Sequence, residues 1–247
     1  MIGSLRAPTG HLDLPFFEDL HRDLGNALAD WVPRQHVNEA DDRQACRDWV
    51  RLLGEHQWLR YCVPAAHGGM LEKLDSRALV ILRENLAFHS PLADFAFAMQ
   101  GLGSGAITLA GSREQQVRYL GAVARGERIA AFALSEADAG SDVAAMKTVA
   151  LQDHLTGTSG SKPSFLMNGS KTWISNGGLA DFYVVFAKTA PEAGTRGITA
   201  FIVDADTPGL DASQHIQVMA PHPLATLTFS NCRLAADTQL GDRKSVV

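Results

Sequence analysis

The chain has 247 residues, enough for one large domain or two domains of ordinary size with ample core. Its 46% apolar and 20% charged residues are typical of a globular protein, and its net charge of −5 disfavours a nucleic-acid or membrane-surface binder. The three cysteines are far apart and form no CxxC pair, so neither disulfides nor a zinc site is expected. Since no signal sequence or long apolar run is present either, we expect a protein of the reducing cytoplasm, with no membrane span.

The first half of the chain carries helical patterns. Over residues 17–31 apolar side chains recur at spacings of three and four and stop before Pro33, which predicts an amphipathic helix. The same spacing returns over residues 46–58, after two acids that suit a helix start. A second helix is therefore expected to run as far as Trp58.

Further helix starts follow a break at PAAHGG, residues 64–69. Either Asp75 or Ser76 could cap the third helix, and a more apolar helix follows Ser90. The sequence SREQ at residues 112–115 has the form of a capping box and predicts one more helix.

From Arg128 the pattern changes to short β-rich runs separated by Gly, Asn, Asp and Pro turns. The runs are RIAAFAL, KTVAL, SFLMNG, KTWISN, DFYVVFAKT, GITAFIVD and LATLTFS. Residues 151–165 are interpreted as a strand connection with a long, flexible tip. The change of pattern predicts an α+β chain, with an N-terminal all-α helical domain over residues 1–127 and a small β-barrel domain over residues 128–247.

Several apparent motifs have simpler explanations. GLGSGA at residues 101–106 matches a dinucleotide-binding pattern, but it follows a helical segment instead of a strand, so close helix packing is the better interpretation. The nine histidines show no metal-binding spacing, and His215 and His222, near a turn-like MAPHP segment, are expected to be surface or hydrogen-bonded residues. No GxSxG motif or cysteine in a nucleophile context is present, so a hydrolase triad is not predicted.

The segment ALSEADAGSD, residues 133–142, has the features of a phosphate-binding turn. A strand ending at Leu134 delivers Ser135 and Glu136, and the small residues up to Ser141 would let backbone amides approach a ligand closely. A plain β-turn held by local Ser and Asp hydrogen bonds would have the same composition. From the residues alone, both interpretations stay open.

A second candidate lies in NGSKTWISNGGLADFYVVFAKT, residues 168–189. Trp173 stands in a strand between polar turns, with the hydroxyl of Ser175 two residues away. A planar heterocycle could stack on this indole, but a tryptophan that closes the end of a barrel would show the same pattern.

Taken together, FALSEADAGSDVAAMKTVA at residues 132–150 and LMNGSKTWISNGGLADFYVVFAKT at residues 166–189 closely resemble the two flavin-binding signatures of the acyl-CoA dehydrogenase family. The resemblance runs from about residue 15 to residue 241 and includes GITAFIVDADTPGL. It implies a helical domain followed by a β-barrel domain that binds FAD. It also implies oxidation of an acyl-CoA thioester to the 2,3-enoyl-CoA, with electrons passing to an electron-transfer flavoprotein.

The resemblance assigns roles in the first signature. It implies that Phe132, Leu134 and Ser135 run along the isoalloxazine of FAD, with the Ser135 hydroxyl on the pyrimidine edge. Gly140 and Ser141 would meet the pyrophosphate, and Ser141 would also contact the acyl-CoA substrate.

In the second signature, the resemblance implies flavin contacts at Trp173, Ile174 and Ser175. The indole of Trp173 would pack on the flavin, and the hydroxyl of Ser175 would approach N5, the atom that accepts hydride. One departure concerns charge: the family commonly has EPGAGSD where this chain has EADAGSD, so Asp138 adds an anion near the expected pyrophosphate.

The resemblance further implies a four-helix bundle after the barrel, which carries the catalytic glutamate. No residue of this chain matches that base, because Glu136 corresponds to the signature glutamate, and no metal ligand is assigned. We therefore expect a truncated dehydrogenase that acts as a homo-oligomer or with a bundle-bearing partner. The alternatives are a non-catalytic or split module that binds flavin and acyl-CoA, and a related acyl-CoA oxidase or flavin monooxygenase.

Overall fold

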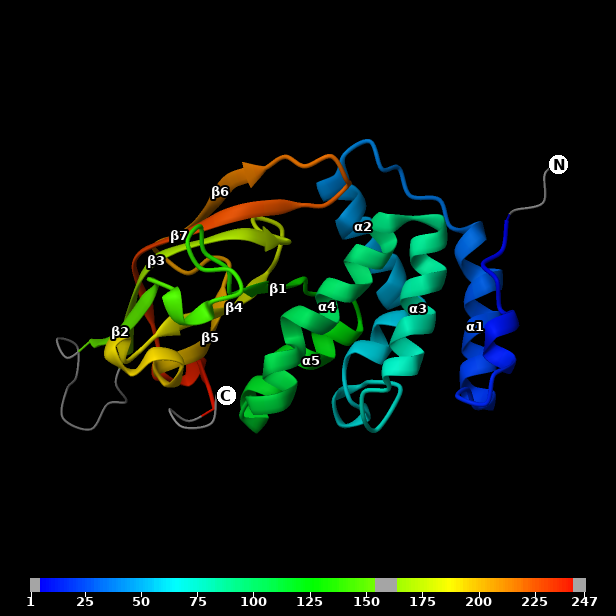
Figure 1. Cartoon of the computed structure of the whole chain (residues 1–247), viewed down its shortest axis with the longest axis horizontal. Helices are drawn as coiled ribbons and strands as arrows, with labels where there is room; N and C mark the ends of the chain where they lie inside the picture. Colours follow the sequence, from blue (N-terminus) through cyan, green and yellow to red (C-terminus); the bar gives the residue numbers. More distant parts are fainter. Residues whose placement is uncertain (1–4, 154–163, 242–247) are drawn as a thin grey trace.

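Helices occupy one end of the molecule and strands the other (Figure 1). The computed structural model describes residues 5–153 and 164–241. The helices are α1 (Asp19–Trp31), α2 (Asp42–Glu55), α3 (Ser76–His89), α4 (Pro91–Ala110) and α5 (Arg113–Ala124). This order confirms the α+β class, with the helical part first. The tip expected within residues 151–165 falls mostly on residues 154–163, which lie outside the described residues.

The helices begin at polar residues that satisfy their free N–H groups. Carboxylates of Asp41 and Asp75 accept two backbone N–H bonds each at the starts of α2 and α3. Ser90 caps α4, and Ser112 forms the expected capping box with Gln115 at the start of α5. These caps confirm the starts that the sequence predicts for α2 to α5.

One helix ends earlier than its apolar spacing indicates. α2 stops at Glu55, and Gln57 takes a left-handed conformation with φ of 66°. Trp58 therefore begins a short 3₁₀ segment, Trp58–Cys62, instead of continuing α2 as expected. A left-handed residue interrupts the α-helical hydrogen-bond ladder, whatever the spacing of the side chains around it.

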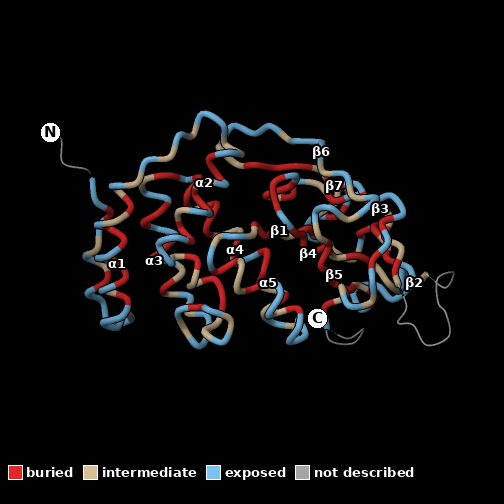
Figure 2. Tube along the Cα trace, turned by 180° about the vertical axis from the view of Figure 1, so that it is seen from behind, coloured by how far each residue is buried: buried red, intermediate tan, exposed pale blue. Residues whose placement is uncertain are grey.

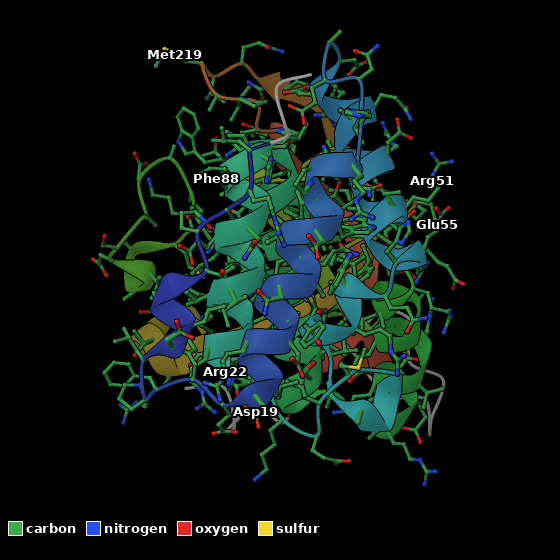
Figure 3. The ribbon with its side chains drawn as sticks, turned by 90° about the vertical axis from the view of Figure 1, so that its right-hand side faces the viewer. Asp19, Arg22, Arg51, Glu55, Phe88 and Met219 are labelled. Atoms are coloured by element: carbon green, nitrogen blue, oxygen red, sulfur yellow. The ribbon has the colours of Figure 1, made fainter. Side chains whose placement is uncertain are left out.

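The charged face of the helical end points away from the core. Figure 3 shows Arg51 and Glu55 of α2 directed outward, and Asp19 and Arg22 together on α1, where an ion pair of 2.6 Å joins them. Among residues 5–153 and 164–241, no helix combines the length and apolar character needed to cross a membrane.

The strands form one mixed sheet in the order β6-β7-β3-β2-β4-β5-β8, and β1 pairs with β4 in parallel. The strands are β1 (Ala130–Ala133), β2 (Val149–Asp153), β3 (Ser164–Ser175), β4 (Phe182–Lys188), β5 (Ile198–Asp204), β6 (Leu210–Ile216), β7 (Leu224–Leu234) and β8 (Gln239–Leu240). These strands form the β part that follows the helices, as expected, on a path of pairings that runs from β6 to β8 with β1 beside β4.

Two features of the sheet differ from the sequence prediction. SFLMNG and KTWISN, expected as two runs, form the single strand β3, whose register with β7 shifts at two places. The strand β6 was not expected, because its sequence LDASQHI is polar and mostly exposed at the edge of the sheet. An edge strand needs no apolar alternation when neither of its faces is deeply buried.

Helix α4 joins the helices to the sheet by packing directly on β1. A side chain at Gly103 would come within 2.7 Å of the Ala131 backbone nitrogen, so the close packing expected for GLGSGA is confirmed at this position. Gln100 donates to the Arg128 carbonyl and accepts from the Ala130 N–H, both at 2.8 Å. Figure 2 shows buried residues running from the helices through β1 into the sheet, as one continuous core.

A buried ion pair joins β3 to the turn after β1. The Lys171 side chain is 0% exposed and its Nζ lies 2.8 Å from Oε1 of Glu136, which is 8% exposed. The Glu136 carboxylate also accepts from the backbone N–H groups of Lys147 and Thr148. Burial opposes ionisation of Glu136, but these hydrogen bonds outweigh it and lower the pKa of Glu136 below its usual value. Burial lowers the pKa of Lys171, and the contact with Glu136 opposes that change.

The first prediction concerns the Gln100 contact between α4 and β1. Replacing this side chain in Gln100→Ala leaves the Arg128 carbonyl and the Ala130 N–H without their partners, at a cost of about 2–3 kcal/mol of unfolding free energy. Urea unfolding measures the loss. The control Gln214→Ala, on exposed β6, should change the unfolding free energy by no more than about 0.5 kcal/mol. Equal effects of the two variants would show that the contact is unimportant.

The second prediction concerns the buried ion pair. Glu136→Gln should destabilise the fold by about 3 kcal/mol, because it leaves Lys171 without a counter-charge and turns an amide donor toward a backbone donor. The double variant Glu136→Gln, Lys171→Met should lose less stability than the sum of the two single variants. Thermal and urea unfolding test both statements. Lys147→Met, which breaks an exposed ion pair with Asp138, is the matched control and should have little effect.

Acid titration of the same variants gives an independent check. Because the folded pKa of Glu136 is lowered, its stabilisation is complete above its unfolded pKa of about 4.3 and is lost as the pH falls through the folded value. Glu136→Gln has no ionisable group there and should lose less stability between about pH 5 and pH 3. If the unfolding free energies of the variant and the wild type fell in parallel as the pH was lowered, ionised Glu136 would not be the group that stabilises the fold.

Candidate functional site

The structure brings the two segments singled out in the sequence side by side. The Thr172 N–H of β3 donates to the Ser135 carbonyl at 3.0 Å, and Lys171 Nζ donates to the Leu134 carbonyl at 2.9 Å. Both contacts fix the backbone just after β1 against the C-terminal part of β3. Segments more than thirty residues apart in sequence therefore form one surface.

Trp173 has an unusual position on this surface. Its indole is 58% exposed, and its backbone takes a φ of 59°, which is rare for a bulky residue. The register between β3 and β7 shifts between Lys171 and Ile174, so a bulge turns Trp173 outward and returns Ile174 to the core. Strained, exposed aromatic residues of this kind are concentrated at ligand sites.

Asn176 holds the turn that follows Ser175. Its side-chain amide donates to the Ala130 carbonyl of β1 at 3.0 Å, and its backbone N–H donates to the Pro223 carbonyl at 2.9 Å. Its side-chain oxygen accepts a long contact of 3.6 Å from the buried Cys46 thiol of α2. One buried asparagine thereby ties the end of β3 to the helices, to β1 and to the segment between β6 and β7.

His222 is a site residue that sequence reasoning missed. It lies between β6 and β7, where this connection reaches the helices (Figure 1), and its Nε2 is 3.0 Å from Oγ of Ser175. Its ring packs against that of Phe95 of α4, with centroids 4.1 Å apart and the ring planes tilted by 52°. Burial lowers the pKa of His222, and Asp42 of α2 opposes that change. The expectation of a hydrogen-bonded histidine is confirmed, but no motif in the sequence indicated that Ser175 would be its partner.

The turn after β1 leaves room for a ligand at Gly140. A side chain built there would meet nothing within 4 Å, and its backbone does not lie in the left-handed region. Neither packing nor backbone conformation therefore requires glycine, and the backbone at this position is open to approach from outside. The added anion Asp138 faces Lys147 at 2.8 Å, which offsets its charge at the surface.

Phe132 lies on the side of β1 that faces α4 and β4. Its ring is 5.0 Å from that of Phe186, and both line an apolar cavity of about 450 Å³. The other lining residues come from α4, β5 and β8: Gly101, Leu102, Gly105, Ala106, Leu109, Ala110, Ala200 and Leu240. Within GLGSGA, Gly103 packs on β1, whereas other residues of the motif line this cavity. The sequence alone does not distinguish them.

The predicted site residues differ in what they can offer to a ligand. Within the described residues, the hydroxyls of Ser135 and Ser141 have no hydrogen-bond partner and are available. The Leu134 carbonyl is occupied by Lys171, and the side chain of Ile174 belongs to the core. Over residues 5–153 and 164–241 no group of three or more His, Cys, Asp or Glu side chains could hold a metal ion, and the three cysteines are free and buried.

Two family models match most of the chain. The model for "Acyl-CoA dehydrogenase, N-terminal domain" covers residues 18–127, and that for "Acyl-CoA dehydrogenase, middle domain" covers residues 131–232. A probable acyl-CoA dehydrogenase, FadE25 of Mycobacterium tuberculosis, is 32% identical over 246 residues, which are 98% of this chain and 61% of the relative. The chain thus spans about three fifths of that relative's length.

Solved structures show the same likeness. The acyl-CoA dehydrogenase of Bacillus anthracis complexed with FAD superposes with a TM-score of 0.77 at 28% identity, covering 92% of this chain and 38% of that one. The prolyl acyl carrier protein oxidase AnaB gives a TM-score of 0.78 at 26% identity, covering 93% of this chain and 60% of that one. Both family models match in chain order, and a relative aligns along nearly the whole of this chain, so the chain belongs to the acyl-CoA dehydrogenase family.

Proposed function

We propose that the protein is an FAD-dependent acyl-CoA dehydrogenase, and that this chain provides its flavin- and acyl-CoA-binding surface. The observation that carries the proposal is Trp173, whose indole is exposed and whose backbone is strained, on a strand that the Thr172 N–H ties to the Ser135 carbonyl of the other signature segment. Family membership and the FAD complex of the similar Bacillus anthracis enzyme support it.

The residues present fit an FAD molecule. An isoalloxazine needs a flat apolar surface and donors along its polar edge, which the Trp173 indole and the unpaired Ser135 hydroxyl supply. A pyrophosphate needs close backbone approach, which the open space at Gly140 and the hydroxyl of Ser141 allow. We propose that Phe132, Leu134 and Ile174 complete the flavin contacts, the last two through their backbone.

When bound, FAD supplies the acceptor for the hydride that leaves the β-carbon of the acyl thioester. The chain's own residues would hold and orient the reactants: Ser175 at N5 and Ser141 against the acyl-CoA. The apolar cavity beside Phe132 suits an uncharged part of a ligand, since apolar side chains line it. We propose that an electron-transfer flavoprotein accepts the electrons, as the resemblance to the family implies.

We assign no catalytic base among the described residues. Glu136 is the acid of the first signature segment that contacts the second, but Lys171 and two backbone N–H groups occupy its carboxylate, and these hydrogen bonds lower its pKa. A general base must be free to reach the substrate proton and needs a pKa near the working pH. Glu136 therefore acts as a structural anchor.

Two alternatives keep specific support. The structural likeness to AnaB, an acyl carrier protein oxidase, favours an oxidase on the same scaffold. A split or non-catalytic module is favoured by the exposed apolar side chains of α4 and α5, among them Leu109, which is 88% exposed, and Val117. We propose that a helical bundle or a second copy covers this face in the assembled protein.

The division into a helical domain over residues 1–127 and a β domain over residues 128–247 belongs to the same proposal.

The third prediction tests the cofactor. Wild-type protein titrated with FAD should show a shifted visible flavin band, and acyl-CoA should bleach it under anaerobic conditions once a helical bundle that carries the base is supplied. Trp173→Ala should weaken FAD binding roughly 5- to 150-fold, since removing an aromatic that stacks on a heterocycle costs about 1–3 kcal/mol. Phe16→Ala, which removes an exposed aromatic before α1, is the matched control and should leave the affinity unchanged.

The same titration separates the alternatives. Rapid oxygen consumption after bleaching would favour an oxidase, and reduction of an electron-transfer flavoprotein would favour a dehydrogenase. A chain that stays colourless with FAD and self-associates would favour the split module. Tight FAD binding that Trp173→Ala does not weaken would exclude the stacking role.

A further inference from the structure

Backbone pairing at neighbouring residues holds His222 close to Ser175. Ser175 pairs with Leu224 across β3 and β7, and the next residue, Asn176, donates its N–H to the carbonyl of Pro223. The two residues that approach at 3.0 Å thus belong to chain segments that are locked in register. The backbone therefore holds the two side chains within hydrogen-bonding distance of each other.

The environment of the His222 ring favours a neutral imidazole. Phe95 of α4 packs on the ring at a tilt, and the charge of Asp42 of α2 acts on it through space. Burial nonetheless lowers the pKa of His222 from its ordinary value, so the ring is mostly uncharged at neutral pH. A neutral imidazole has one nitrogen that donates and one that accepts, so Nε2 can take either role toward Ser175.

A serine hydroxyl has one proton and two lone pairs, so its partner decides what it offers elsewhere. If Nε2–H of His222 donates to Oγ, the Ser175 proton is free to be donated to a ligand. If Nε2 is bare, Ser175 donates to His222, and Oγ presents a lone pair to the ligand. The pair can therefore present a donor or an acceptor at one point in space.

We propose that His222 is a positioning residue for Ser175: it fixes the Ser175 hydroxyl and sets the direction of its proton toward the flavin. This inference rests on the proposed function, in which Ser175 lies at N5. Flavin N5 accepts a hydrogen bond in the oxidised state and carries a proton that it can donate in the reduced state. A hydroxyl that can reverse its direction suits both states, which a fixed donor does not.

The experiment compares two replacements of His222 in the FAD-loaded protein. His222→Phe keeps an aromatic ring against Phe95 but removes Nε2, whereas His222→Gln keeps a hydrogen-bonding amide and loses the ring. If the hydrogen bond matters, the flavin reduction potential of His222→Gln should lie nearer to the wild-type value than that of His222→Phe. If instead the reduction potential of His222→Phe lay nearer to the wild-type value, His222 would act only through the packing of its ring, and the inference would be overturned.

A double-variant cycle shows whether His222 acts through Ser175. We expect Ser175→Ala and His222→Phe each to change the ratio of reduced-state to oxidised-state FAD affinity by about 5- to 10-fold, the effect of one hydrogen bond. The double variant should change it no further than Ser175→Ala alone. An undiminished effect of His222→Phe in the Ser175→Ala background would overturn the inference. His215→Phe, on exposed β6, is the matched control and should leave the ratio unchanged.

A measurement without flavin tests the contact itself. The ring ¹⁵N chemical shifts of His222 report which nitrogen carries the proton, and Ser175→Ala should change them while leaving those of His215 unaltered. Unchanged His222 shifts would overturn the inference. Wild-type protein that binds no FAD would overturn the proposed function together with the inference, whereas normal FAD binding with additive variants would overturn the inference alone.

Discussion

The site depends on one buried charge, the ammonium of Lys171. This group has no exposure, and a charge removed from water is costly unless partners surround it. Its partners are the Leu134 carbonyl and the Glu136 carboxylate, which come from the turn after β1. Satisfying Lys171 therefore forces that turn against β3. The neighbouring Ser135 and Trp173 are brought to the same surface as a consequence.

A second constraint relates this surface to the helices. Asn176 connects the end of β3 to β1 and α2. Gln100 of α4 pairs with two backbone groups at the start of β1, the Arg128 carbonyl and the Ala130 N–H. In each case an amide side chain pairs with backbone groups that β1 would otherwise leave unsatisfied in the core. The helices and the sheet thus share polar contacts as well as apolar packing. The relative position of α4 and β3, and with it the contact of Phe95 with His222, is fixed by these amides.

The sequence predicted features that depend on local physics. Helix starts at Asp41, Asp75 and Ser112 follow from side chains that cap nearby N–H groups, and the apolar strands follow from alternation. The early end of α2 and the polar edge strand β6 were missed, because neither has a signal in apolar spacing. Both signatures were recognised by resemblance, but the proximity of His222 to Ser175 was not. That contact depends on how β7 registers with β3, which the spacing of residues along the chain does not encode.

Glu136 and Ser175 illustrate how position divides the chemistry of the site. Every hydrogen bond that Glu136 accepts comes from a donor that is itself fixed by the fold, so its carboxylate stays ionised and has no freedom to exchange protons. Within the described residues, the Ser175 hydroxyl pairs with the His222 side chain alone, and that partner can donate or accept. The glutamate of the first signature is therefore committed to structure. Adjustable hydrogen bonding belongs instead to a neutral hydroxyl and imidazole. When one ring nitrogen releases a proton and the other takes one up, the hydrogen bond reverses and no new charge is placed in the core.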